Sequence, residues 1–245
     1  MQQRLPSLYS RPILFAHRGA SAYAHENTSE AFELALRIGA TGLETDCWVT
    51  KDQQVVLDHD GVVKSRTWTL FKTKKIQQVI AAELGQSIMS FADLLKIAAP
   101  STPISVDVCD PSAMPIINAL VSNIDQKSTI FICHPDLSLL KTWKQIFPDF
   151  KYVNSTRLSK LVEGPERRCA DLANAGIDAL NMHHTDWSGG LVALAHRFDR
   201  AAFSWDIQHA EQMNTALLMG VDAIYSDWPD RMSDAYRSVF ETKQV

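Results

Sequence analysis

The chain has 245 residues, of which 46% are hydrophobic and 21% are charged, and its formal net charge is -4. This length suits one large α/β barrel or two small domains, and the acidic balance argues against nucleic acid as a partner, because nucleic-acid-binding proteins carry a basic face. The sequence has no apolar signal-peptide core and no run long enough for a membrane span, so we expect a soluble cytoplasmic protein. Four cysteines without CxxC spacing favour reduced thiols over disulfides or a zinc site.

The first predicted element is a strand over residues 12–16, an apolar run that ends at His17, Arg18 and Gly19. A titratable imidazole and a permanent cation therefore follow a buried strand where it opens into a loop. The next element is a helix that begins near Asn27 and has an apolar stripe ending at Gly39, a common helix stop.

The second strand is predicted over residues 43–50, and it carries two acids. Side chains two apart in a strand point the same way, so Glu44 and Asp46 lie on one face. Two carboxylates this close repel unless a cation lies between them, and Mg²⁺ and Ca²⁺ prefer oxygen ligands. Ion pairs with Arg18 or Lys51 are the alternative explanation of these acids.

A polar turn at residues 51–54 separates the second strand from the apolar residues 55–57, which predicts a β-hairpin with its second arm over residues 55–58. If the chain reverses between Asp52 and Gln53, Asp46 lies opposite His59. A slip of one residue in this register would turn His59 to the other face of the hairpin. The hairpin therefore predicts that a second histidine joins the acid pair.

Residues 61–89 have a weaker pattern. Lys72, Lys74 and Lys75 are typical of a solvated face, and we expect a helix over residues 75–83. A clearer helix begins at Ser90. The third strand, over residues 104–108, places Asp107 between β-branched residues, where an acid needs a partner.

Strand-like and helical runs alternate through the rest of the chain. Further strands are expected at residues 129–133, 151–153, 179–182, 201–205 and 223–225, and helices at 112–123, 137–146, 159–175, 191–197, 210–219 and 229–240. Counted from the first strand, eight strand–helix units predict an α/β fold, a (β/α)8 TIM barrel with a β-hairpin inserted after the second strand. The absence of any linker predicts a single domain over residues 1–245. Active sites of this fold lie at the carboxyl ends of the strands, where His17, Glu44 and Asp46 are expected.

Several motifs together resemble a known family. His17-Arg18-Gly19, HENT at residues 25–28, ETD at 44–46, TKD at 50–52 and His59-Asp60 resemble the N-terminal signature of the glycerophosphodiester phosphodiesterases. Residues 205–208 resemble the Trp-Thr-Val-Asn strand of that family, and residues 220–230 resemble its last strand and loop. The resemblance covers nearly the whole chain, and its motifs occur in the family's order.

The resemblance implies metal-dependent hydrolysis of glycerophosphodiesters to glycerol 3-phosphate and an alcohol, a reaction of lipid and glycerol metabolism. It implies one divalent ion, Mg²⁺ or Ca²⁺, bound by Glu44, Asp46 and Asp107. A His17 and His59 pair would transfer protons, and Arg18 and Trp205 would contact the substrate. It also implies a route through a cyclic phosphate formed by the glycerol 2-hydroxyl. Whether the protein forms a homo-oligomer stays open.

The third strand departs from the family pattern, in which a metal-binding Glu is followed two positions later by Lys. Here the two positions are Asp107 and Cys109. Without the Lys, a cation that would face the phosphate is lost, so Lys151 or a protonated His134 is a candidate replacement.

Three alternative functions fit part of the pattern. Lysophospholipase D and sphingomyelinase D-like phosphodiesterases share the barrel signature and the histidine pair, although the sphingomyelinase D-like enzymes are secreted and disulfide-bonded. A glycoside hydrolase would explain paired carboxylates on a barrel, but not two histidines beside an arginine. A non-catalytic barrel that binds a phosphate ligand would explain the missing Lys.

Overall fold

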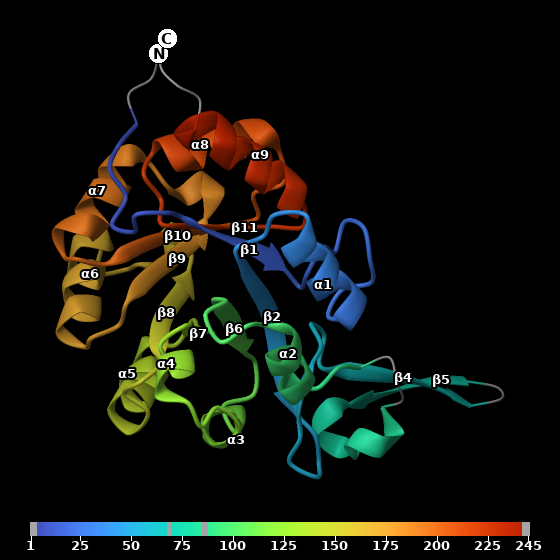
Figure 1. Ribbon diagram of the computed structural model, residues 1–245. Coiled ribbons are helices and arrows are strands. Elements are labelled where there is room, and N and C mark those ends of the chain that lie inside the picture. The colour runs from blue at the N-terminus through green and yellow to red at the C-terminus, as the bar shows by residue number, and fades with distance from the viewer. Residues whose placement is uncertain (1–3, 68–69, 85–87, 242–245) are drawn as a thin grey trace.

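The computed structural model describes residues 4–67, 70–84 and 88–241, and its centre is a closed barrel of parallel strands (Figure 1). The barrel strands are β1 (Ile13–His17), β2 (Gly42–Val49), β6 (Ile104–Val108), β7 (Ile130–His134), β8 (Lys151–Thr156), β9 (Ala179–His183), β10 (Ala201–Trp205) and β11 (Ala223–Ser226). Strand β1 pairs with both β2 and β11, which closes the sheet. The predicted (β/α)8 barrel is confirmed.

The helices lie outside the barrel, between successive strands (Figure 1). They are α1 (Ser29–Arg37), α2 (Phe91–Ile97), α3 (Ala113–Leu120), α4 (Ile124–Lys127), α5 (Leu137–Ile146), α6 (Pro165–Asn174), α7 (Gly189–Arg197), α8 (Ala210–Leu218) and α9 (Pro229–Phe240). Helix α1 starts where its sequence predicts, because the Thr28 hydroxyl accepts a hydrogen bond from the Ala31 amide at 3.2 Å. No described helix is both long and apolar enough to cross a lipid bilayer.

The predicted hairpin after the second strand is present, but the predicted register is wrong. Strand β3 (Val55–Leu57) pairs with β2 so that Cys47 faces Leu57 and Trp48 faces Val56. This places Asp58, and not His59, next to Asp46, and the Asp58 amide donates to the Asp46 carbonyl at 3.2 Å. The Thr50 hydroxyl bonds Asp52 and the Gln54 amide, which sets a turn one residue tighter than expected.

A second hairpin, which the sequence pattern did not predict, projects from the barrel (Figure 1). It consists of β4 (Val62–Thr67) and β5 (Leu70–Lys75), which pair antiparallel. The helix expected over residues 75–83 is wrong, because Lys75 ends β5 and only the short 3-10 turns Ile76–Gln78 and Ala81–Glu83 follow. Buried Ile76 and Val79 anchor this segment against Val56 of β3.

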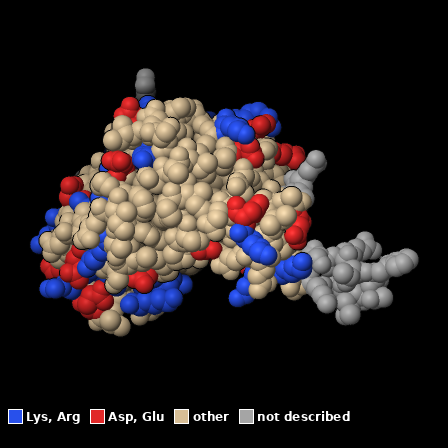
Figure 2. Space-filling view, turned by 90° about the horizontal axis from the view of Figure 1, so that it is seen from below, with Lys and Arg blue, Asp and Glu red and all other residues tan. Residues whose placement is uncertain are grey.

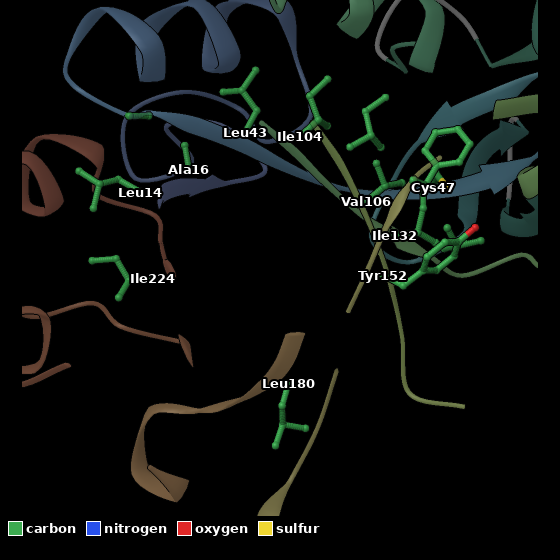
Figure 3. Packing of buried hydrophobic residues seen from close by; sticks show 14 of the residues in the cluster. Leu14, Ala16, Leu43, Cys47, Ile104, Val106, Ile132, Tyr152, Leu180 and Ile224 are labelled. Carbon is green, nitrogen blue, oxygen red and sulfur yellow. The ribbon is translucent and has the colours of Figure 1, made fainter. Parts of the chain in front are cut away.

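Two apolar cores hold the barrel. The larger one lies between strands and helices and includes Leu43, Ile104 and Ile132 (Figure 3). The smaller one fills the barrel interior, where Phe15 stacks on Tyr225 at 4.9 Å and meets Phe131 edge to face at 5.7 Å.

All four cysteines are free thiols, as predicted, with Cys47, Cys133 and Cys169 buried and Cys109 partly exposed. On the face shown in Figure 2, basic and acidic side chains are interspersed around its edges.

Candidate active site

A tight turn ends β1 and aims its polar residues at the mouth of the barrel. Arg18 and Gly19 both have positive φ, 54° and 86°. A Cβ atom at position 19 would lie 2.7 Å from Ala31, so this turn requires glycine. The Arg18 amide donates to the Glu44 carboxylate at 3.0 Å, which ties the turn to β2.

All side chains predicted as site residues line one cavity of about 320 Å³ at this mouth. They come from five places in the chain: the end of β1, strand β2, the segment after β3, β6 and β10. The predicted members are His17, Arg18, Glu44, Asp46, His59, Asp107 and Trp205. The structure thus brings these residues together, while their individual roles stay predictions.

Three carboxyl groups form the acidic centre of the cavity. Asp46 faces Asp107 across the β2–β6 pair, and oxygen atoms of Glu44, Asp46 and Asp107 all lie within 4.8 Å of one another. Burial raises the pKa of Glu44 to about 8, although the nearby His17 opposes this. Burial and the charge of Asp46 raise the pKa of Asp107 to about 7. Crowded acids of this kind fit a hard divalent ion, which takes carboxylate ligands and would offset their repulsion.

Asp107→Asn should show this repulsion directly. Without divalent ions, the variant should unfold at a higher temperature than the wild type, because it removes one of three crowded charges. Each kcal/mol gained should raise Tm by about 2 to 4 °C for a chain of this size. Added Mg²⁺ or Ca²⁺ should raise the Tm of the wild type and leave the Tm of the variant almost unchanged. Thermal unfolding followed by circular dichroism measures both values. A variant that melts lower in chelator and still responds to the ions would contradict this account.

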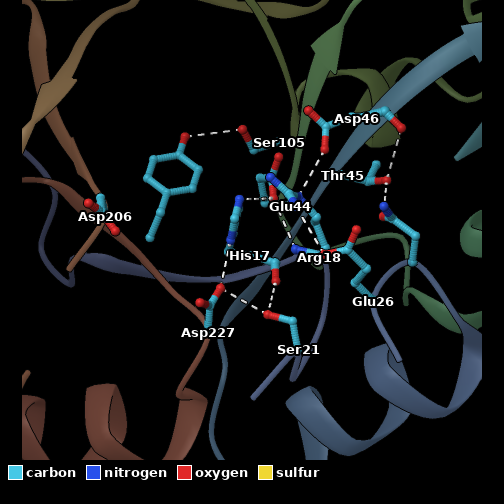
Figure 4. Close-up of polar contacts among 12 residues, drawn as sticks. His17, Arg18, Ser21, Glu26, Glu44, Thr45, Asp46, Ser105, Asp206 and Asp227 are labelled. Atoms are coloured by element: carbon cyan, nitrogen blue, oxygen red, sulfur yellow. Dashed lines mark hydrogen bonds and ion pairs between the residues drawn. The ribbon is translucent and has the colours of Figure 1, made fainter. Parts of the chain in front are cut away.

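His17 is held by Asp227, an acid that directly follows the last strand (Figure 4). Its Nδ1 lies 2.7 Å from Oδ1 of Asp227, which also bonds the Ser21 hydroxyl at 2.9 Å. Its Nε2 lies 4.0 Å from the Glu44 carboxylate. Burial lowers the pKa of His17, but Glu44 and the bond to Asp227 outweigh this effect and raise it to about 9. One nitrogen is thus fixed and the other faces the acidic centre.

His59 reaches the cavity although the hairpin register differs from the predicted one. Strand β3 ends at Leu57 and the chain then bends, so the alternation of a strand no longer decides the direction of the side chain. Its Nδ1 lies 2.8 Å from Asp60 Oδ1, and the side chain is 49% exposed. Each histidine therefore has an aspartate on Nδ1.

Arg18 lies between acids on two sides of the cavity wall (Figure 4). Its Nη1 donates to Glu26 at 3.0 Å, and its Nε lies 3.1 Å from Asp46 Oδ2. The Nε contact is an ion pair without hydrogen-bond alignment, so both atoms are buried without a hydrogen bond. Burial lowers the pKa of Arg18, but Asp46 and Glu26 outweigh it and raise the value, so the guanidinium stays charged.

A second cavity of about 530 Å³ adjoins the first and shares Asp46, Asp107, Ser155 and Trp205 with it. It also contains the residues that depart from the family pattern. Cys109 and His134 line it, together with the cations Arg157 and Lys160. Burial raises the pKa of Cys109 to about 12, so this position presents a neutral thiol.

The two candidate replacements for the missing lysine are placed differently. Lys151 begins β8, at the opposite end of the strand from the cavity, and bonds Asp178 at 3.1 Å. His134 lines the second cavity, but its Nδ1 accepts the Asp136 amide and burial lowers its pKa. Lys160 has no ion-pair partner among the described residues, and Arg157 is paired with Asp186.

The sequence did not predict some residues that contact His17 or line the cavity. Asp227 contacts His17 only because β11 pairs with β1, and the one signal for it was its position just after the last strand. Asn181 and Tyr225 line the cavity from strand interiors, where each follows an apolar residue, Leu180 or Ile224. The Asn181 Oδ1 and the Trp205 Nε1 are both buried without a hydrogen-bond partner among the described residues.

Comparison with known families gives one match over most of the chain. The model of the glycerophosphoryl diester phosphodiesterase family matches residues 17–231. A glycerophosphodiester phosphodiesterase of Caldanaerobacter subterraneus subsp. tengcongensis is 25% identical over 256 residues, covering 93% of this chain and 98% of the relative. A lysophospholipase D of Homo sapiens is 35% identical over 109 residues, covering 38% of this chain and 35% of the relative.

Solved structures share the fold. The structure of an Oleispira antarctica phosphodiesterase, in complex with the product sn-glycerol-3-phosphate, aligns with a TM-score of 0.76 at 18% identity. The alignment covers 92% of this chain and 96% of that one. At this level of identity, the similarity shows a common barrel architecture.

Proposed function

The chain belongs to the glycerophosphoryl diester phosphodiesterase family, and we propose that it hydrolyses glycerophosphodiesters to glycerol 3-phosphate and an alcohol in a metal-dependent reaction. The observation that carries this proposal is the meeting of Glu44, Asp46 and Asp107 with His17 and His59 in one cavity. An acidic centre for an ion and two imidazoles for protons are the parts that phosphodiester hydrolysis needs. The product bound to the Oleispira antarctica phosphodiesterase, sn-glycerol-3-phosphate, agrees with the proposed product.

Glu44, Asp46 and Asp107 would hold the divalent ion, Mg²⁺ or Ca²⁺. When bound, it supplies Lewis-acid stabilisation of the negative charge that develops on the phosphate. The crowding of three carboxyl groups beside the one guanidinium of Arg18 fits this role, because a hard divalent ion would offset their repulsion.

Arg18 would orient the phosphate. Two of its nitrogens already face Glu26 and Asp46, while its Nη2 makes no hydrogen bond to a described residue. A planar guanidinium with its other donors fixed has little freedom left to lose when it binds a phosphate oxygen. Trp205 would pack against the substrate, with its unpaired Nε1 as a further donor.

His17 and His59 would transfer the protons. In each, an aspartate fixes Nδ1, so that Nε2 is left to exchange a proton with the substrate. One histidine accepts a proton from the attacking hydroxyl, and the other donates a proton to the leaving alkoxide. Asp227 and Asp60 would position the rings and stabilise them when charged.

Cys109→Lys should tighten substrate binding. A unit charge about 4 Å from the phosphate is worth about 4 kcal/mol at an effective dielectric of about 20, before desolvation is subtracted. If about 1.4 kcal/mol of this survives, KM should fall about tenfold. Cys109→Met is the matched control, since it adds length without charge. An equal change in KM for both variants would show that charge at this position has no part in binding.

The neighbouring cavity favours a second candidate function, lysophospholipase D activity. It adjoins the acidic centre and is larger than the first cavity, so it has room for a bulky group of the diester. The local similarity to a human lysophospholipase D agrees with this alternative. A panel of glycerophosphodiesters and lysophospholipids should be assayed with Mg²⁺, Ca²⁺ and Mn²⁺ after chelation. Turnover of lysophospholipids alone would favour the alternative over the main proposal.

A further inference from the structure

Three side chains with metal-ligating atoms meet at the ends of β9 and β10, outside the acidic centre. One ligand atom each of His183, His184 and Asp206 lies within 4.8 Å of the others. The contact between His183 Nε2 and Asp206 Oδ2 measures 3.1 Å. The strand pairing explains this meeting, because His183 faces Trp205 in the register and the next residue of each strand leaves the sheet.

The local backbone turns both histidines to one side. In a continuing strand, consecutive side chains would point to opposite faces. Here β9 ends at His183 and a 3-10 turn begins at His184, so the two rings lie 4.5 Å apart with an interplanar angle of 34°. Asp206 has a φ of 60°, a left-handed conformation that aspartate and asparagine tolerate better than most residues.

We infer that His183, His184 and Asp206 form a second metal site, which takes a divalent ion of the zinc class. Imidazole nitrogens select borderline ions such as Zn²⁺ or Co²⁺, whereas a centre of carboxylates alone suits Mg²⁺ or Ca²⁺. Two histidines and one carboxylate are also a common set for zinc, with a solvent molecule in the open position. The two sites share no ligand, so the ions should bind independently.

The surroundings of His183 fit a ligand. Its Nδ1 lies 2.7 Å from the Thr185 hydroxyl and 3.3 Å from the Thr185 amide, which donates to it. To bind an ion through Nε2, the ring needs the tautomer with its proton on Nδ1, and the Thr185 hydroxyl is then the hydrogen-bond acceptor for that nitrogen. Metal-binding histidines usually have such a partner on the other nitrogen. Ligands about 2 Å from one ion lie roughly 3 to 4 Å apart, so the cluster needs only small rotamer changes to bind. The Asp206 side chain is 51% exposed, which gives an ion access.

The site lies at the rim of the proposed catalytic cavity. Asp206 lines that cavity beside Trp205, and His183 packs against the edge of the Trp205 ring at 4.7 Å. In the competing interpretation, the bond between His183 and Asp206 only supports the tryptophan. The two interpretations differ in whether the chain binds a zinc-class ion when the acidic centre is saturated or removed. This inference does not depend on the proposed hydrolysis.

Binding of Co²⁺ tests the site, because its visible absorption reports the ligands. The full chain should bind one Co²⁺ in excess Mg²⁺, measured by equilibrium dialysis and by absorption. His183→Ala and His184→Ala should each weaken this binding by at least about tenfold. Even the loss of a residue that only hydrogen-bonds to a metal ligand lowers metal affinity by about this factor. Asp206→Asn, which suits the left-handed backbone, should also weaken it.

Two controls make the result specific. His25→Ala removes an exposed histidine outside this cluster, and Asp107→Asn removes a proposed ligand of the acidic centre. Both variants should bind Co²⁺ in excess Mg²⁺ as the wild type does. Thermal melts establish that each variant is folded, and Zn²⁺ should raise the Tm of the wild type more than that of His184→Ala. If the wild type binds no Co²⁺ in excess Mg²⁺, or if the folded His184→Ala variant binds it as tightly as the wild type, the inference is wrong.

Discussion

His17→Ala should lower the turnover number for a glycerophosphodiester by about 10²- to 10⁴-fold, the range for loss of a general acid or base. The histidine lies at the end of β1 with its Nδ1 held by Asp227, so the alanine variant removes the proton-transfer group at the centre of the cavity. The measurement is kcat at saturating substrate and fixed metal concentration. His59→Ala should fall within the same range, since that ring is held by Asp60 in a similar way.

Positioning variants separate a catalytic from a structural role of these histidines. Asp227→Asn keeps the size of the side chain but removes its charge, so the dependence of kcat on pH should shift as the imidazolium loses its partner. His25→Ala is the matched control, because His25 is exposed, and it should keep wild-type turnover. An unchanged kcat for folded His17→Ala would place the proton transfer elsewhere. An unchanged kcat for His59→Ala would remove that residue from the reaction.

Chelation should abolish turnover, and Mg²⁺ or Ca²⁺ should restore it, because the carboxyl groups of Glu44, Asp46 and Asp107 crowd together and a divalent ion would offset their repulsion. Glu44→Gln should weaken metal binding and lower turnover together, with partial recovery at high metal concentration. Calorimetric titration of the ion beside the steady-state rate gives both quantities. Asp93→Asn, an exposed acid of α2, is the control and should change neither. Full activity of Glu44→Gln after exhaustive chelation would contradict the metal role.

The barrel could be predicted from the sequence because its units are local. Apolar runs mark most of the strands, apolar stripes mark most of the helices, and the count of alternating units decides the architecture. Motifs at the ends of different strands are then predicted to lie in one site, because all the parallel strands of a barrel have their carboxyl ends on the same face. Glu44, Asp46 and Asp107 lie on adjacent strands, so their meeting required only the order of the strands.

Other features depend on long-range geometry. The contact between His17 and Asp227 joins residues at the two ends of the chain and forms only when β11 closes against β1. The hairpin register depends on whether the turn is longer or shorter by one residue. The hydrogen bond between the Thr50 hydroxyl and the Asp52 carboxylate helps to set that length. His59 still reached the cavity because the strand ends before it, which a pattern of alternation does not reveal.

The structure of residues 61–84 also could not be predicted from the local sequence pattern. The described part of this segment forms a two-stranded arm and two 3-10 turns rather than the predicted helix. Its strands pair with each other and not with the barrel sheet, so they stand outside the alternation of strands and helices that forms the barrel. The cluster of His183, His184 and Asp206 escaped prediction for another reason, since two neighbouring strand ends bring it together.

Release of glycerol 3-phosphate from glycerophosphocholine by the purified chain is the most direct test of the central claim. The reaction should be run after chelation, then with Mg²⁺ or Ca²⁺ restored, and both glycerol 3-phosphate and choline should be measured over time. We predict steady release of the two products in equal amounts, many turnovers per chain, only when the ion is present. Binding of the diester without turnover, or release at the same rate in chelator, would contradict the account.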